Sequence, residues 1–333
     1  MTRQNLQLSL ALSDNPNTRP LLDGRVEAEG IRLVSTAVHP SEMFWRQLKF
    51  AEFDVSEMSM SSLLIATSHG PTQWVALPVF TTREFFHTRM LVRADAGINS
   101  PSDLRGKRVG VPEFQQTAAI WGRGALQHEF GVKTAEIEWF MERPAEKSHG
   151  GATGTIAPPG VTIHQIPMST NIGEMLVAGE LDATLLYLTN PNLVDRSRID
   201  LSAHPRVRPM FPDREAEGRR YYAKTGLYPI NHTVVVRRSL YEQHPWIALN
   251  LYSAFAKAKN EVAQRGQTYL RNYFTTGLIG DDVKRALATD PMAYGVKSAR
   301  TVLETIAQYV HEQGLTQRRV GLEEIFAPST MDL

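Results

Sequence analysis

The run from Asp103 to Phe130, DLRGKRVGVPEFQQTAAIWGRGALQHEF, constrains the fold more than any other part of the chain. A polar turn precedes a short apolar segment, Arg108–Val111, and a loop then leads into an amphipathic segment that begins at Thr117. This order predicts a buried β-strand followed by an α-helix with Thr117 as its N-cap. The unpaired amides at such a helix start attract anions, although an ordinary strand–helix unit without a ligand would show the same pattern.

Strand-like and helix-like segments alternate along the rest of the chain. The segments that we expect to form strands are Leu6–Leu12, Ile31–Thr36, Phe53–Ser56, Trp74–Phe80, Met90–Val92, Glu136–Phe140, Leu181–Leu188 and Ile230–Val236. Those that we expect to form helices are Thr18–Leu22, Pro40–Phe50, Leu63–Ser68, Ile172–Ala178, Leu240–Arg265 and Ser298–Gln313. Such alternation predicts α/β layers, in which ligands bind at the loops that follow the C-terminal ends of strands.

Three stretches are predicted to be loops. Residues 57–62, EMSMSS, form a hydroxyl-rich connection between a strand and a helix. Pro144–Gly160 is rich in Gly, Ser, Thr and Pro, which is typical of an exposed loop or lid, and its glycine spacing fits neither a P-loop nor a dinucleotide-binding motif. Ala203–Tyr228 is basic and is predicted to be a solvated surface loop.

Composition excludes several classes of function. A length of 333 residues fits two domains, and a formal net charge of +1 gives no general attraction to nucleic acid or to a membrane. The absence of cysteine excludes disulfides, thiolate zinc sites and a cysteine nucleophile. The first residues contain no apolar run typical of a signal peptide, and no stretch approaches the ~20 apolar residues of a membrane span. We therefore expect a cytoplasmic protein.

Several longer runs resemble one known family. The runs GRVEAEGIRL, FDVSEMSMSSLLIA, PVFTTREFFHT, LRGKRVGVPEFQQTAAIWGRGAL, LDATL and YPINHTVVVRRSL are similar to those of the 4,5-dihydroxyphthalate decarboxylase family, and the similarity spans about Leu6 to Tyr252. The family's activity removes one carboxylate from 4,5-dihydroxyphthalate and gives protocatechuate, within phthalate degradation. One residue departs from the family pattern, because Phe86 stands where a PSRxFRHS-like run has a basic residue. Loss of that cation would favour a substrate with fewer carboxylates or a more apolar face.

The resemblance also implies a fold. It predicts the α/β fold of type II periplasmic binding proteins, in which two lobes, each a mixed sheet flanked by helices, close on a ligand in the cleft between them. Lobe 1 is expected to contain residues 1–94 and 230–333, and lobe 2 residues 95–229.

An aromatic dicarboxylate needs cations and hydroxyl or amide donors around it. Arginine suits a carboxylate because its planar fork can donate two parallel hydrogen bonds. Arg19, Arg83 and Arg123 are the candidates for this role, although an arginine in such a loop is more often part of a surface ion pair. The further candidates for binding carboxylates or hydroxyls are Ser59, Ser61, Gln116, Thr117 and Asn231.

Decarboxylation of a hydroxybenzoate needs a base and an acid. We hypothesise that the base takes the proton of the hydroxyl para to the departing carboxylate, so that the ring becomes quinoid at the ipso carbon, and that the acid delivers a proton to that carbon. His232 and His87 are the candidates, since histidine titrates near neutral pH. Glu57 is a third candidate, because burial would raise the pKa of its carboxyl. A structural histidine and a helix-capping glutamate are the alternative interpretations.

The remaining predictions concern cofactors, partners and other functions. The sequence contains no HExxH motif, no His-x-His pair and no GxSxG elbow, so we expect neither a metal nor a cofactor, while a metal held by Glu57, His87 and His232 is left open. A small aromatic carboxylate is the expected partner, and a homo-oligomer is expected for a soluble enzyme of this size. A non-catalytic solute-binding protein for an organic anion is the alternative function. A third possible function is that of another enzyme on the same fold, from a menaquinone or pyrimidine-precursor pathway.

Overall fold

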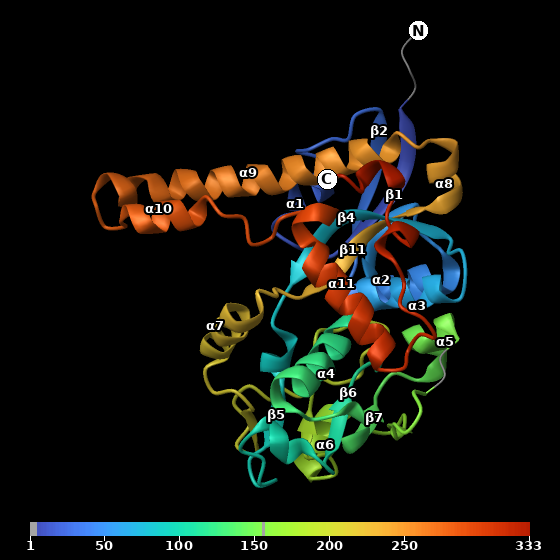
Figure 1. The fold of residues 1–333 in the computed structure, drawn as a ribbon, viewed down its shortest axis with the longest axis vertical. Helices are drawn as coiled ribbons and strands as arrows, with labels where there is room; N and C mark the ends of the chain where they lie inside the picture. The colour runs from blue at the N-terminus through green and yellow to red at the C-terminus, as the bar shows by residue number, and fades with distance from the viewer. Residues whose placement is uncertain (1–4, 155–156) are drawn as a thin grey trace.

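Two mixed β-sheets, one in each lobe, organise the chain (Figure 1). The computed structural model describes residues 5–154 and 157–333. Within these residues, the strands of the first sheet are, in spatial order, β2 (Ile31–Ala37), β1 (Leu6–Leu12), β3 (Val55–Ser59), β11 (Ile230–Arg237) and β4 (Trp74–Arg83). The strands β2, β1 and β3 are parallel, whereas β11 runs antiparallel to both of its neighbours.

The second sheet has the same mixed character. Its strands in the described part of the chain are, in spatial order, β10 (Val207–Pro209), β5 (Leu91–Arg93), β9 (Ala183–Thr184), β6 (Arg108–Val111), β7 (Glu138–Met141) and β8 (Ile163–Gln165). The strands β9, β6, β7 and β8 are parallel, and β5 and β10 pair antiparallel at one edge. The predicted arrangement of two α/β lobes with mixed sheets is confirmed.

Helices flank both sheets (Figure 1). The α-helices are α1 (Arg19–Leu22), α2 (Pro40–Phe50), α3 (Met60–Ser68), α4 (Thr117–Phe130), α5 (His149–Thr153), α6 (Ile172–Ala178), α7 (Arg214–Thr225), α8 (Arg238–Gln243), α9 (Ile247–Thr275), α10 (Asp281–Leu287) and α11 (Val296–Glu312). The 3₁₀ helices are η1 (Phe86–Arg89), η2 (Pro101–Leu104), η3 (Thr134–Glu136), η4 (Ala145–Lys147), η5 (Leu322–Glu324) and η6 (Pro328–Thr330).

Helix α11 packs against both lobes. The residues predicted to face inward on it, Val302, Leu303, Ile306 and Val310, are buried. The helix contacts α3 of the first lobe and α4 of the second. Contact with α4 is close because Gly124 has no side chain, and a Cβ there would meet the ring of Tyr309 at 2.1 Å.

Several predicted elements differ from the structure. Residues 57–62 are not a loop, because β3 continues to Ser59 and α3 begins at the next residue. The basic stretch Ala203–Tyr228 contains β10 and α7, which begins where Asp213 accepts a hydrogen bond from the Ala216 amide. Pro144–Gly160 includes the buried start of α5 rather than an exposed loop throughout, and its residues 155 and 156 lie outside the described part of the chain.

The predicted lobe boundary at residues 94 and 95 is also corrected. Strand β5 pairs with β9 and β10, so it belongs to the second sheet and the chain leaves the first lobe before Leu91. The chain returns to the first sheet at β11. The remaining limits of the two lobes stay a prediction. Of the described helices, none is both long and apolar enough to cross a membrane.

Candidate active site

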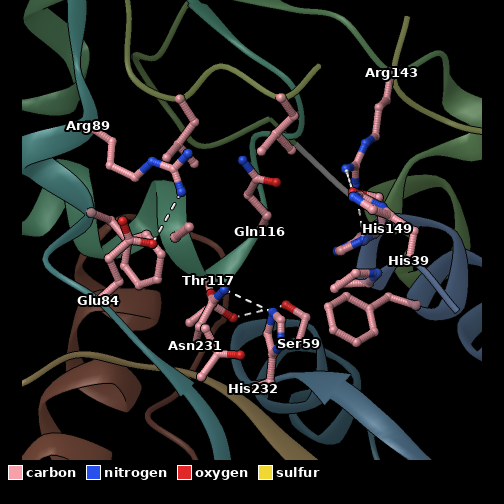
Figure 2. Close-up of a pocket in the computed structure, with 18 residues that line it drawn as sticks. His39, Ser59, Glu84, Arg89, Gln116, Thr117, Arg143, His149, Asn231 and His232 are labelled. Carbon is pink, nitrogen blue, oxygen red and sulfur yellow. Dashed lines mark hydrogen bonds and ion pairs between the residues drawn. The ribbon is translucent and has the colours of Figure 1, made fainter. Parts of the chain in front are cut away.

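A cavity of about 180 Å³ lies between the two lobes (Figure 2). It is similar in size to an engineered protein cavity of about 150 Å³ that binds benzene. The first lobe contributes residues of α2, β3, β4 and β11, and the second contributes the start of α4 and the segment around α5. The lining residues are His39, Pro40, Ser41, Phe44, Ser59, Thr82, Glu84, Phe86, Arg89, Gln116, Thr117, Ala118, Arg143, His149, Leu186, Leu188, Asn231 and His232.

Glu57 and His232 form a hydrogen-bonded pair in the cavity wall. They lie on the neighbouring strands β3 and β11, and 3.0 Å separates His232 Nδ1 from Glu57 Oε2. Because Glu57 accepts from Nδ1, the other ring nitrogen, Nε2, carries a lone pair. Asn231 Nδ2 donates to that nitrogen at 2.8 Å. The ring edge also packs on Phe44, with 4.7 Å between ring centroids. His232 is therefore a fixed imidazole with its basic nitrogen at the cavity.

Glu57 is ionised, which corrects its predicted role as a proton donor. Ser13 donates from both its amide and its hydroxyl to Oε1, at 2.7 and 2.6 Å, and the Thr81 hydroxyl donates to Oε2 at 2.7 Å. Burial alone would raise the pKa of this carboxyl, but the hydrogen bonds from His232, Ser13 and Thr81 lower it below its usual value. Glu57 does not line the cavity, so it positions His232 rather than contacting a ligand.

The starts of α3 and α4 meet at the cavity. Thr117 Oγ1 accepts a hydrogen bond from the Ser61 amide at 2.9 Å and lies 2.9 Å from Ser59 Oγ. Thr117 therefore caps α3 rather than its own helix, whose N-cap position belongs to Gln116. Ser59 and Thr117 line the cavity, as expected for ligand-binding hydroxyls. Ser61 does not, because its hydroxyl donates to the carbonyl of Gln115.

Gln116 offers a free donor to a ligand. Its side chain points into the cavity, between Arg89 and Arg143 (Figure 2), and is only 9% exposed. Its Nε2 atom is buried and has no hydrogen-bond partner among the described residues. Since an unpaired buried amide costs about 1–3 kcal/mol, this atom is poised to donate to a bound anion.

Arg143 is a buried cation in the cavity wall that was not predicted from the sequence. Its Nε donates to Asp195 at 2.7 Å and its Nη2 to Ser41 at 2.7 Å, so it also joins the two lobes. Its Nη1 donates to Nε2 of His149 at 3.3 Å. The pKa of Arg143 is raised, because Asp195 outweighs the effect of burial. Two of its five N–H groups have no partner among the described residues and remain for a ligand.

His149 is a neutral imidazole behind Arg143. Its Nε2 accepts from Arg143, so its Nδ1 carries the proton and donates to Ser62 Oγ at 2.9 Å. Burial, with the Arg143 charge as a second cause, lowers the pKa of His149 well below its usual value. His39 lies on the same side of the cavity (Figure 2), and its Nδ1 is buried without a partner in the described structure.

Arg89 supplies a second cation on the opposite side of the cavity (Figure 2). Its Nη1 donates to Glu84 at 3.2 Å, and both residues line the cavity. Side chains three residues apart in a 3₁₀ helix lie one above the other, so η1 presents Phe86 and Arg89 to the same cavity. Helix η1 thus contributes a cation to the cavity through Arg89, although Phe86 is apolar.

None of the three predicted arginines lines the cavity. Arg19 is exposed and pairs with Asp14 at 2.5 Å. Arg83 donates to the backbone carbonyls of Tyr228 and Ala293. The predicted loop positions did not show which way each of these arginine side chains points.

Arg123 is the third of these arginines. It is buried two turns into α4, where it donates to the Phe114 carbonyl and to Gln313. Burial lowers its pKa to about 9, so it stays charged near neutral pH. Its side chain therefore lies between the Phe114 carbonyl and Gln313 and does not line the cavity.

His87 is also displaced from the predicted site. It is buried against α7, where its Nε2 lies 3.0 Å from Glu217, and it does not line the cavity. The metal site that Glu57, His87 and His232 would share is therefore not assembled. In the part of the chain that the structure describes, no group of three or more His, Asp or Glu side chains could hold a metal ion.

Comparison with known proteins assigns the family. The chain is 34% identical over 330 residues to a 4,5-dihydroxyphthalate decarboxylase of Comamonas testosteroni, and the match covers 98% of each chain. It is 36% identical over 180 residues to the enzyme of that name in Pseudomonas putida, covering 54% of this chain and 70% of the relative. The chain belongs to the 4,5-dihydroxyphthalate decarboxylase family. No family model matches it.

This member of the decarboxylase family shares its fold with a class of binding proteins. The alkanesulfonate-binding protein SsuA of Xanthomonas axonopodis pv. citri, solved with bound MOPS, superposes with a TM-score of 0.55 at 14% identity, covering 98% of both chains. The predicted type II periplasmic-binding-protein fold is confirmed by this similarity.

Only some of the cavity residues of this decarboxylase-family chain were predicted from its sequence. The structure brings together five predicted residues, Ser59, Gln116, Thr117, Asn231 and His232, with Glu57 directly behind them. Five polar residues that line the cavity were not predicted: His39, Glu84, Arg89, Arg143 and His149. A signal was present, because Arg143 directly precedes the small-residue stretch that was predicted to be a loop, and His149 interrupts that stretch.

Proposed function

We propose that the protein decarboxylates 4,5-dihydroxyphthalate to protocatechuate, a step of phthalate degradation. The observation that carries the proposal is the Glu57–His232 pair, which presents a basic imidazole nitrogen to a cavity that two arginines also line, in a chain of this family. A cytoplasmic location and self-association of the chain, both expected from the sequence, belong to the same proposal.

The cavity has the groups that an aromatic dicarboxylate with two hydroxyls needs. Arg143 and Arg89 stand on opposite sides of it and Gln116 between them, so carboxylates are bound at that end. Phe44 and Phe86 offer apolar contact to the ring. His232 and Asn231 lie toward the floor of the view in Figure 2, where the hydroxyls are bound.

The reaction needs one base and one acid. The hydroxyl para to the departing carboxylate replaces Asn231 as the hydrogen-bond partner of His232 Nε2, and this nitrogen takes the hydroxyl proton. The oxygen's electron pair moves through the ring to the carbon that bears this carboxylate, and that carbon takes a proton. The carbon–carbon bond then breaks, carbon dioxide leaves, and the electron pair of that bond restores the aromatic ring. The proton on His232 returns to the oxygen, so the net reaction consumes one proton.

We assign the delivery of that proton to His39. Among the other described titratable side chains that line the cavity, His149 is kept neutral by burial and by the Arg143 charge, which lower its pKa, and Glu84 accepts from Arg89. His39 has a buried Nδ1 without a partner. Burial lowers the pKa of His39, which makes its protonated form a stronger acid.

The test mixes the purified protein with 4,5-dihydroxyphthalate, with and without a chelator, and follows protocatechuate by chromatography. Product in both samples is the expected result, and loss of product with chelator would indicate an essential metal. Binding without product would favour a solute-binding protein for an organic anion instead. In deuterated water, the wild-type protein should also exchange the ring hydrogen of protocatechuate, and His39→Gln should lose this exchange.

A further inference from the structure

The outer part of α9, together with α10, projects from the first lobe as a helical hairpin (Figure 1). We call residues 260–290 the arm. The inner part of α9 is anchored in the core through Leu251, Phe255 and Ala258, which are fully buried. Beyond Ala258, no described residue of α9 is buried. Because most of a helix's stability in a protein comes from packing of its amphipathic face, we expect the arm to pack against a partner surface.

The apolar face of α9 continues onto the arm. Spacings of three and four residues from Leu251, Phe255 and Ala258 lead to Val262, Gly266, Tyr269 and Tyr273, which lie on the same helical face. We call these last four residues the stripe. Tyr269 is 78% exposed and Tyr273 is 51% exposed. The stripe therefore has the pattern of a core face, without anything in the described chain to cover it.

Helix α10 does not cover the stripe, because it packs on the other side of α9. A groove between the two helices is lined on α9 by Gln267, Arg271 and Phe274 and on α10 by Lys284 and Leu287. At 100° per residue, these α9 positions lie roughly opposite the stripe. Helix α10 consequently leaves the stripe uncovered.

We propose that the stripe pairs antiparallel with the stripe of a second copy of this chain. A twofold axis between Gln267 and Thr268 sets Tyr269 opposite Gly266 of the partner subunit, and Tyr273 opposite Val262 of the partner subunit. Each contact then occurs twice, as an isologous interface requires. A Cβ at Gly266 would meet nothing within 4 Å, so this position offers an open notch for a tyrosine ring.

The charges of the arm favour a second copy over a charged partner. The arm has four acidic residues, Glu261, Asp281, Asp282 and Asp290, and four basic residues, Arg265, Arg271, Lys284 and Arg285. Two arms therefore meet without net repulsion, whereas a nucleic acid would require a basic excess. This proposal does not depend on the enzymatic activity.

The first experiment measures the mass of the full chain by sedimentation equilibrium. The wild-type protein should form a dimer or a larger even oligomer, and Tyr269→Glu with Tyr273→Glu should weaken self-association at least tenfold. Ala263→Glu with Asn272→Glu adds the same charges to exposed positions of α9 outside both the stripe and the groove, and should leave the mass unchanged. A monomeric wild-type protein, or equal weakening by both variants, would overturn the proposal.

The second experiment tests the register and does not depend on how the charged variants fold. Because the chain has no cysteine, a protein with Gly266→Cys can be mixed with one carrying Tyr269→Cys under mild oxidation. The mixture should form a disulfide-linked dimer much faster than either variant alone. A mixture that reacts no faster than the single variants would show that the stripes do not pair in this way.

Discussion

Glu57 has a hydrogen-bond donor for each of its acceptor positions, and this arrangement determines the state of His232. Three donors come from Ser13 and Thr81, so the carboxylate keeps its position and its charge whether or not a ligand is bound. Its remaining contact fixes the His232 proton on Nδ1 and leaves Nε2 as the base. The chemistry proposed for His232 thus depends on a residue that does not contact the ligand.

Glu57→Gln is therefore predicted to impair catalysis more than binding. The amide cannot accept from all of these donors, so the imidazole loses its fixed orientation and tautomer. We expect kcat to fall by about 10²–10⁴-fold, with KM changed by less than about tenfold. Steady-state kinetics would measure both. His87→Gln is the matched control, because His87 also pairs with a glutamate but lies outside the cavity. Unchanged kcat in Glu57→Gln would remove the pair from the mechanism.

The sequence contained the residue types of the site but not their directions. His232 and Thr117 stand at ends of strands and helices inside family-like runs, and such positions face the cleft in this fold. Arginine side chains are long, and the positions of Arg83 and Arg123 near loops did not show where their guanidinium groups end. Only the tertiary structure shows that Arg143 reaches Ser41 across the two lobes.

At the scale of elements, local sequence signals predicted most helices and strands. They did not predict α5, the start of which is buried. Helix α6 has the predicted bounds, Ile172–Ala178, and Asn171 caps its start by accepting from the Glu174 amide. Helix α5 is short and rich in glycine, so its composition indicated a loop. Its place in the core comes from side chains distant in sequence, since Glu113 accepts from the His149 amide at 2.9 Å.

The burial of His149 in α5 predicts a dependence of stability on pH. Its pKa is lowered in the folded protein, so below about pH 6.5 the unfolded chain binds a proton that the folded chain does not. The free energy of unfolding should therefore fall as the pH decreases from about 6.5 toward the folded-state pKa, by up to about 1.4 kcal/mol per pH unit for this group.

Urea denaturation at a series of pH values would measure this dependence. In His149→Gln the slope below about pH 6.5 should be smaller, because glutamine can accept from Arg143 and donate to Ser62 without titrating. His87 has a pKa lowered by burial as well, so part of the slope should remain. An identical slope in the variant and the wild-type protein would show that His149 does not titrate on unfolding.

For the whole molecule, the cavity is part of the connection between the lobes. Arg143 donates to Ser41 of α2, and the Trp45 indole of the same helix donates to the Glu146 carbonyl at 3.0 Å. His149 Nδ1 donates to the Ser62 hydroxyl of α3, and this hydrogen bond also connects the two lobes. A ligand that binds Arg143 and the first lobe together should therefore stabilise the complete two-lobed fold rather than one lobe.

Phthalate tests this expectation, because it has both carboxylates but no ring hydroxyl for the base to act on. At 100 times its Kd it should stabilise the wild-type protein by about 2.7 kcal/mol, seen as one cooperative thermal transition that moves to higher Tm. Arg143→Lys keeps a positive charge beside Asp195 but loses the planar fork, so its Kd for phthalate should rise by about tenfold or more. Arg83→Lys is the matched control and should bind like the wild-type protein, because Arg83 donates to backbone carbonyls and does not line the cavity. Wild-type affinity in Arg143→Lys, or weaker binding in Arg83→Lys alone, would place the anion site elsewhere in the molecule.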